Sequence, residues 1–169
     1  AWIGQLVTVY ALGSLLAAIP LTAATRRQRR RPLLLLAIAG FAVANTVTAV
    51  SASYPLILAA RLLAGVSAGL LWALLAGYAS RMVAPAQQGR AIAVAMLGTP
   101  LALALGVPAG TLLGQLWGWR WTFGAMSLLS LGLLVWARAA LPDFAGQAAT
   151  AALPLRRVLG LRGIAQVLA

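Results

Sequence analysis

The sequence predicts an all-α protein, a polytopic bundle of transmembrane helices. Of its 169 residues, 63% are hydrophobic and 8% are charged, and the mean hydropathy of +0.96 lies far above that of an ordinary soluble domain. The apolar residues gather in long runs with few charges, and about 20 apolar residues suffice for a helix to cross a bilayer. Five spans are expected, at about residues 1–24, 33–53, 55–80, 91–116 and 122–140.

The charged residues exclude several classes of function. All 13 basic residues are Arg and Asp143 is the only acid, so the formal net charge is +12. The Arg residues separate apolar runs instead of alternating with aromatic residues, which favours contact with anionic lipid over nucleic acid. With no Cys, no His and one acid, neither a metal site nor an acid–base pair is expected within this chain. No phosphate-binding loop is present either, so we expect no enzyme, no cofactor and no ATP-driven step.

The first two spans each carry a polar side chain of interest. Residues 1–24 contain no charge, and Tyr10 lies toward their outer half; residues 33–53 have Asn45 near their centre. Both side chains are candidate substrate contacts, or they form ordinary interhelical hydrogen bonds. A short outer turn follows, and Pro55 suits the first turn of the third helix.

The third span contains the candidate for the functional centre. At about 100° per residue, Arg61, Gly65, Ala68, Trp72 and Ala76 share one helix face. A cation, a wide aromatic side chain and small residues between them are a plausible lining for a water-filled cavity, and an Arg inside a membrane span is a functional candidate. The alternative is that Arg61 extends to the outer interface. The sequence does not decide between the two.

The fourth span is rich in Gly and Pro. Small residues let helices approach closely in lipid, whereas Pro removes a backbone hydrogen bond and bends or loosens a helix. The pattern predicts either a bendable helix that rocks against a neighbour or a static packing seam, and the spacing alone favours the seam. The residues concerned are Gly98, Pro100, Gly106, Pro108, Gly110 and Gly114. Three Trp residues then precede the fifth span, where an aromatic belt is expected.

The distribution of Arg predicts the orientation, because short cytoplasmic loops are enriched in Lys and Arg. With the loop between the first two spans inside, 11 of the 13 Arg residues fall on the inner side, and only Arg61 and Arg120 fall toward the outer side. Residue 1 is then outside and the tail cytoplasmic. Residues 141–157 are expected as a cytoplasmic linker and residues 158–169 as the start of a further, truncated helix, so we expect a piece of a larger protein.

Four motifs, in order along the chain, resemble those of the major facilitator superfamily of transporters. They are Tyr10–Gly13 with Pro20 and the loop to Leu34; Arg61–Gly65 with Gly69; Gly98 with Gly106–Gly110 and Gly114; and Gly118–Phe123. They are similar to the family's loop between the second and third helices, its Arg motif in the fourth, its antiporter motif in the fifth and its turn before the sixth. The branch that the chain resembles is that of bacterial proton-coupled sugar and drug efflux permeases.

The resemblance implies that the five spans are the second to sixth helices of a twelve-helix fold, in which a half is built from inverted three-helix repeats. It implies that Arg61, which shares its cavity face with Gly65 and Trp72, takes part in proton coupling, and that the fourth span is a gating helix. It also implies an inner-gate loop with Arg26, Arg27, Arg30 and Arg31. The family's usual Asp in this loop is absent, since Thr25 or Arg26 stands there, and Arg29 replaces its usual Gly.

We therefore expect an N-terminal portion of a transporter of the bacterial inner membrane. It would export a small organic solute, such as a drug or a sugar, in exchange for protons by alternating access. Its partners would be lipid, substrate, protons and the remaining helices. One alternative is an importer of the same family, which the direction of transport under an imposed pH gradient would identify. The other is a truncated membrane protein that does not transport.

Overall fold

The computed structural model describes residues 2–25 and 27–146, and all regular secondary structure in that part of the chain is helical. Five stretches are long and apolar enough to cross a membrane, which confirms the predicted all-α bundle. Arg26, residues 147–157 of the predicted linker and the predicted helix at 158–169 lie outside the described residues. The helices are α1 (Trp2–Ala24), α2 (Arg30–Val50), α3 (Tyr54–Arg81), η1 (Pro85–Gln87), α4 (Gln88–Met96), α5 (Gly98–Leu101), η2 (Ala102–Gly106), α6 (Val107–Trp117) and α7 (Trp119–Ala140).

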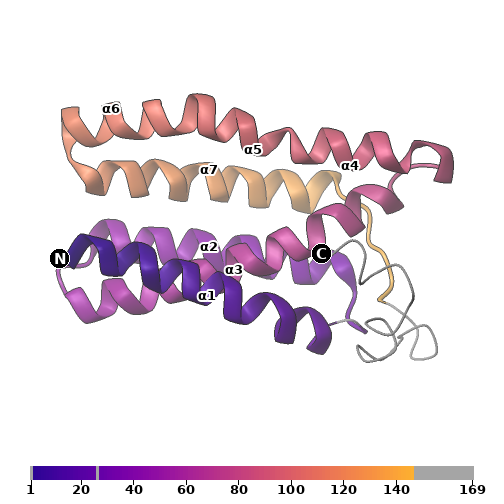
Figure 1. Cartoon of the computed structure of the whole chain (residues 1–169), viewed down its shortest axis with the longest axis horizontal. Helices are drawn as coiled ribbons and strands as arrows, with labels where there is room; N and C mark the ends of the chain where they lie inside the picture. Colours follow the sequence, from indigo (N-terminus) through magenta and orange to yellow (C-terminus); the bar gives the residue numbers. More distant parts are fainter. Residues whose placement is uncertain (1, 26, 147–169) are drawn as a thin grey trace, which may run out of the picture.

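The helices form an arc in which neighbours in space are often not neighbours in sequence. The principal contacts join α1 to α3, α3 to α2, α2 to α7 and α7 to α6, and α3 also meets α4. Figure 1 shows α1, α2 and α3 on one side, and the long rod from α4 to α6 beside α7 on the other. The arc is therefore held together through α2 and α3, whose buried faces make its core.

The seam between α1 and α3 depends on glycine. A Cβ on Gly69 would lie 2.6 Å from the carbonyl oxygen of Ser14, and a Cβ on Gly13 would lie 2.7 Å from that of Leu62. A Cβ on Gly65 would overlap the carbonyl oxygen of Tyr10. Such close contact of backbones is how helices associate in lipid, where apolar burial gives no drive to pair.

The fourth span is a single rod, residues 85–117, that changes its winding in the middle. Between Pro100 and Pro108 the chain forms one π-helical turn, and the N–H of Val107 donates to the carbonyl of Ala102, five residues earlier. Pro108 has no N–H to donate, so the regular ladder is interrupted at this point. The rod is not buried by the described residues, and its principal contact with α7 is made by α6, where Gly110 and Gly114 lie against Thr122.

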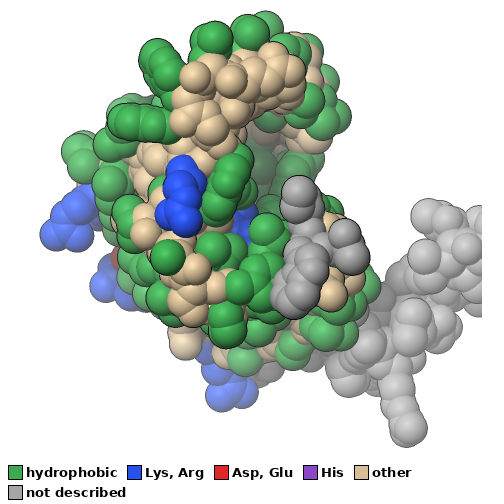
Figure 2. All heavy atoms as spheres, turned by 90° about the vertical axis from the view of Figure 1, so that its left-hand side faces the viewer, with side chains coloured by type: hydrophobic (Ala, Val, Ile, Leu, Met, Phe, Trp, Pro, Cys, Tyr) green, Lys and Arg blue, Asp and Glu red, His purple; other side chains and the backbone are tan. Residues whose placement is uncertain are grey.

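Gly118 makes the turn that reverses the chain into α7. Its φ of 89° is the only positive φ in the described part of the chain, and this left-handed region is accessible to Gly at no steric cost. Helix α7 therefore begins at Trp119, three residues before its predicted start. Figure 2 looks at this end of the molecule and shows hydrophobic side chains over most of it, with a hollow between the two sides of the arc.

Candidate functional site: a buried arginine and an apolar cavity

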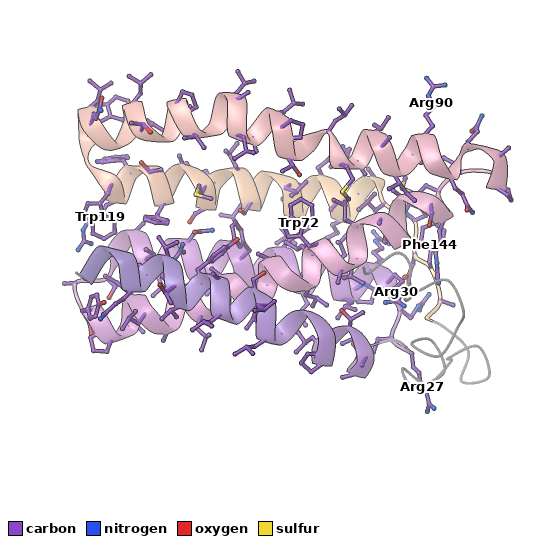
Figure 3. The ribbon with its side chains drawn as sticks, in the orientation of Figure 1. Arg27, Arg30, Trp72, Arg90, Trp119 and Phe144 are labelled. Atoms are coloured by element: carbon purple, nitrogen blue, oxygen red, sulfur yellow. The ribbon has the colours of Figure 1, made fainter. Side chains whose placement is uncertain are left out.

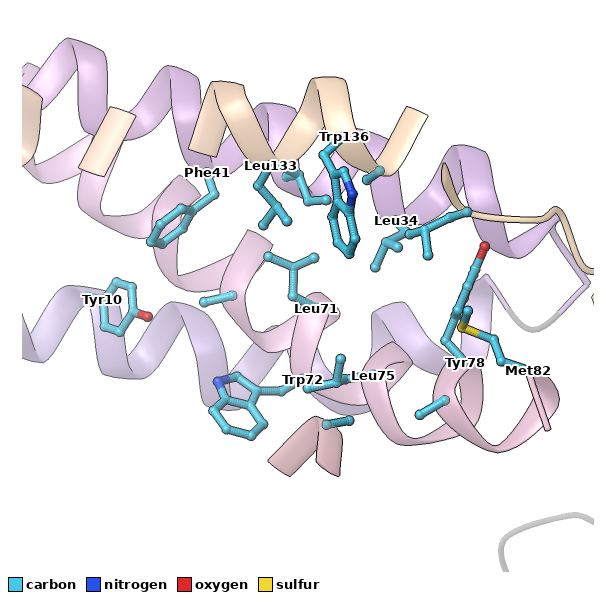
Figure 4. Close-up of a pocket in the computed structure, with 16 residues that line it drawn as sticks. Tyr10, Leu34, Phe41, Leu71, Trp72, Leu75, Tyr78, Met82, Leu133 and Trp136 are labelled. Carbon is cyan, nitrogen blue, oxygen red and sulfur yellow. The ribbon is translucent and has the colours of Figure 1, made fainter. Parts of the chain in front are cut away.

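A cavity of about 480 Å³ opens on the concave side of the arc. Its walls come from α1, α2, α3, α4 and α7, and they are mainly apolar. Figure 4 shows Tyr10 and Trp72 at one end, Leu71 and Trp136 in the middle, and Tyr78 at the other end. An apolar pocket with few polar groups suits an organic solute of low polarity.

Arg61 lies deeper in the bundle, where α3 meets α2 and α7. Its Nη2 donates a hydrogen bond of 2.8 Å to Oδ1 of Asn45 on α2, and its guanidinium carbon lies 4.5 Å from the centre of the Phe123 ring on α7. The Asn45 amide is itself oriented by donating from Nδ2 to the carbonyl oxygen of Phe41 at 2.9 Å. Arg61 is 7% exposed and Asn45 is not exposed at all.

This arginine is a buried cation whose partners are dipoles. The only acid in the chain, Asp143, follows the last span, so the charge is stabilised by an amide oxygen and an aromatic face. The Nε atom of Arg61 is buried and has no acceptor among the described residues. A buried donor of this kind is costly until it is paired.

The predicted cavity residues divide into two groups. Tyr10 and Trp72 do line the cavity, as does Ala68. Arg61 and Gly65 do not lie on its wall as the helical spacing had suggested, because α2 and α7 cover Arg61 and the backbone of α1 covers Gly65. Asn45 likewise faces Arg61 and not the cavity.

A second polar contact links α2 to α7 one turn away from the ring of Phe123. Thr46 donates from Oγ1 to Oγ of Ser127 at 3.1 Å, and Ser127 is buried. Neither Phe123 nor Ser127 was among the predicted site residues. Phe123 belongs to the Gly118–Phe123 motif, but nothing in the spacing indicates that its ring meets a residue 62 positions earlier.

Comparison with known proteins identifies the family. The profile described as Major Facilitator Superfamily matches residues 1–165. The chain belongs to the major facilitator superfamily. This is a family of multi-pass membrane transporters and not of enzymes, and the five candidate spans of the described residues agree with it.

Three bacterial proteins illustrate what this superfamily chain is similar to. A chloramphenicol efflux pump of Mycobacterium tuberculosis is 33% identical over 83% of the chain and 34% of its own length. A chloramphenicol resistance protein of Streptomyces lividans is 37% identical over 90% of the chain and 39% of its own length. A probable sugar efflux transporter of Pasteurella multocida is 30% identical over 78% of the chain and 32% of its own length. The chain therefore spans about a third of the length of these relatives.

The predicted gate residues of this superfamily chain lie apart from the cavity. Gly98 and Gly106 have no atom of the described residues within 4 Å of an added Cβ. Arg27 and Arg30 lie at the end of the bundle that is far from Trp119 (Figure 3). There Arg27 projects outward, whereas Arg30 lies beside Phe144. Asp143, which the sequence did not indicate as a site residue, pairs with Arg29 at 2.7 Å.

Proposed function

We propose that the chain is the N-terminal portion of an exporter of the bacterial inner membrane. It exchanges protons for a small organic solute by alternating access, and its spans are the second to sixth helices of the whole protein. The names of the relatives support export, since they include a chloramphenicol efflux pump, a chloramphenicol resistance protein and a probable sugar efflux transporter. The apolar cavity supports a solute with an aromatic or aliphatic body, held against Tyr10 and Trp72.

The observation that carries the proposal is the burial of Arg61. A cation inside a span is expensive and is kept where it serves transport or ion coupling. Arg61 keeps a buried Nε donor that the described residues do not satisfy. In the proposed mechanism a carboxyl group elsewhere in the whole transporter binds this guanidinium when ionised and leaves it when protonated. Protonation thereby changes which conformation is favoured.

The proposed orientation follows the charges. The arginine-rich loop between α1 and α2 and the end of α7 lie on the cytoplasmic side, together with the tail. The turn between α6 and α7 lies outside, with its Trp residues at the interface. The loop then acts as the inner gate, and the rod from α4 to α6 moves against neighbouring helices during the change of access.

The test uses the whole transporter, as its gene encodes it, in inverted membrane vesicles with an imposed pH gradient. Chloramphenicol is the first probe, and a panel of sugars is the second. We expect accumulation that requires an acidic lumen and is abolished in Arg61→Ala, with the amount of protein in the membrane unchanged. Export that is unaffected in Arg61→Ala contradicts the coupling role. Uptake into intact cells driven by external acid identifies an importer instead.

A further inference from the structure

Helix α2 begins with a sequence that cannot cap it. Its N-cap residue is Arg29, which makes no side-chain cap, and its first turn contains no acid. The first N–H groups of any helix lack acceptors within the helix, and its N-terminus repels cations. Three consecutive cations, Arg29 to Arg31, nevertheless stand there. The acceptors and the negative charge must come from another part of the molecule.

Both come from the residues that follow α7. The carbonyl oxygen of Phe144 accepts from the N–H of Arg30 at 2.9 Å, and Oδ1 of Asp143 accepts from the N–H of Arg31 at 3.2 Å. The second carboxylate oxygen, Oδ2, lies 2.7 Å from Nε of Arg29. One carboxylate, 112 residues from the helix that it serves, therefore supplies both a cap and a counter-charge.

The same residues, Leu141–Gly146, are also fixed to α3, and we name them the return segment. The hydroxyl of Tyr78 donates to the carbonyl of Pro142, and the Tyr78 and Phe144 rings meet edge to face at 5.2 Å. Arg81 donates from Nη1 to the carbonyl oxygen of Ala145 at 2.7 Å. The return segment thus joins the ends of α2, α3 and α7 beside the cavity, whose wall includes Tyr78 and Leu141.

We propose that Asp143 is the positioning residue of the arginine loop, Arg27–Arg31. It caps α2 from the end of α7 and so holds the loop against this end of the bundle. No other residue of the chain can replace its carboxylate, because it is the only acid. The inference concerns the position of the loop and does not require that the protein transports anything.

The cap contributes more than the ion pair. Arg29 is 74% exposed at its side chain, and an exposed ion pair contributes little in water. Loss of a helix cap leaves a backbone donor without its acceptor, which has a larger effect. Asp143→Ala is therefore expected to release the loop, whereas Arg29→Ala, which removes the ion pair alone, is expected to leave it nearly in place.

The experiment is limited digestion with trypsin of the whole purified protein in lipid nanodiscs, where both faces are accessible. Mass spectrometry compares cleavage after Arg27 and Arg29 with cleavage after Arg90, an exposed site on α4 that serves as an internal reference. We expect Asp143→Ala to raise this ratio about tenfold. Arg29→Ala removes the trypsin site after residue 29, so for this variant only cleavage after Arg27 is compared with cleavage after Arg90. We expect that ratio to rise less than twofold. Asp143→Glu should restore the ratio, and the exposed control Gln87→Ala should not alter it.

Two results overturn the inference. In the first, the cleavage ratio of Asp143→Ala equals that of Gln87→Ala. In the second, Asp143→Ala and Arg29→Ala raise the cleavage after Arg27 equally, which assigns the role to the ion pair.

A second measurement covers the case in which Asp143→Ala fails to fold. This chain has no Cys, so once any Cys elsewhere in the whole protein is replaced, Gln28→Cys and Ala145→Cys form a single pair, and a short bis-maleimide should cross-link them. Absence of that cross-link in the folded protein also overturns the inference, and none of these results bears on the transport proposal.

Discussion

Arg61 and Asn45 fix each other inside the bundle through a hydrogen bond of 2.8 Å from Nη2 to Oδ1. The amide cannot turn away without losing its own bond to the carbonyl of Phe41, so its oxygen stays aimed at the guanidinium. An amide carries no charge, and Arg61 therefore keeps its net positive charge at this position. A carboxylate there would neutralise it. The hydrogen bond thus fixes the position of the guanidinium but leaves its positive charge available to interact with another charged group.

The first prediction concerns this pair. Asn45→Ala removes the acceptor and leaves the guanidinium buried, so the free energy of unfolding should fall by about 1.5–3 kcal/mol. Unfolding by heat in detergent, followed by tryptophan fluorescence, measures the change. Thr48→Val is the matched control, because Thr48 is equally buried and bonds only to Ala44 on its own helix in the described structure. An equal fall in the free energy of unfolding of the two variants would show that the interhelical bond adds no more stability than a bond within α2.

The second prediction compares two glycines of α3. Gly65→Ala places a methyl group on the carbonyl of Tyr10, so α1 and α3 must separate, at a cost of about 1–3 kcal/mol. Gly77→Ala meets no described atom within 4 Å and should stabilise the helix by about 0.5–1 kcal/mol. Melting temperatures of the two variants should therefore move in opposite directions. A fall of the same size in both would place the effect in the helix and not in the seam.

Much of the fold is predictable because lipid imposes strict requirements. Every backbone group in a span must be satisfied by its own helix, so long apolar runs separated by Arg become helices, and the five spans follow. The seam glycines also stand out, since small residues recur every four positions. The sequence does not specify which neighbour each face meets. Helical spacing put Gly65 on a cavity wall with Trp72, but α1 covers that part of the face.

The contacts of the candidate site could not be predicted for the same reason. Asn45 and Arg61 belong to different helices, and no periodicity links them to the ring of Phe123. Asp143 lies in a short polar stretch that is typical of a linker, yet its carboxylate caps a helix 112 residues earlier. The cap also explains why α2 starts at Arg30 and not at residue 33: the return segment lets two charged residues, Arg30 and Arg31, enter the first turn.

The third prediction tests the gating role proposed for the fourth span. A Cβ at Gly106 meets no described atom within 4 Å, so Gly106→Ala should leave the melting temperature unchanged or slightly raised. If the rod slides against helices outside the described part, the same variant should lower the rate of export severalfold. Gly89→Ala is the control, since it also has open space but lies at the start of α4. Equal export by both variants and the wild type would leave the rod as a static element.

The fourth prediction concerns the cavity. Trp72 lines it and is 52% exposed in the described structure, so Trp72→Ala should remove a contact with the solute while changing stability little. An aromatic contact contributes about 0.5–1.5 kcal/mol beyond its area, which corresponds to a rise in the KM for chloramphenicol of up to about tenfold. Trp117→Ala is the control, because Trp117 is similarly exposed but packs against Trp121 at the turn between α6 and α7. A rise in KM confined to Trp72→Ala places the solute in the cavity. A rise of equal size in both variants would instead indicate a general effect of losing an indole from the membrane region, and the cavity would then have no special part in binding.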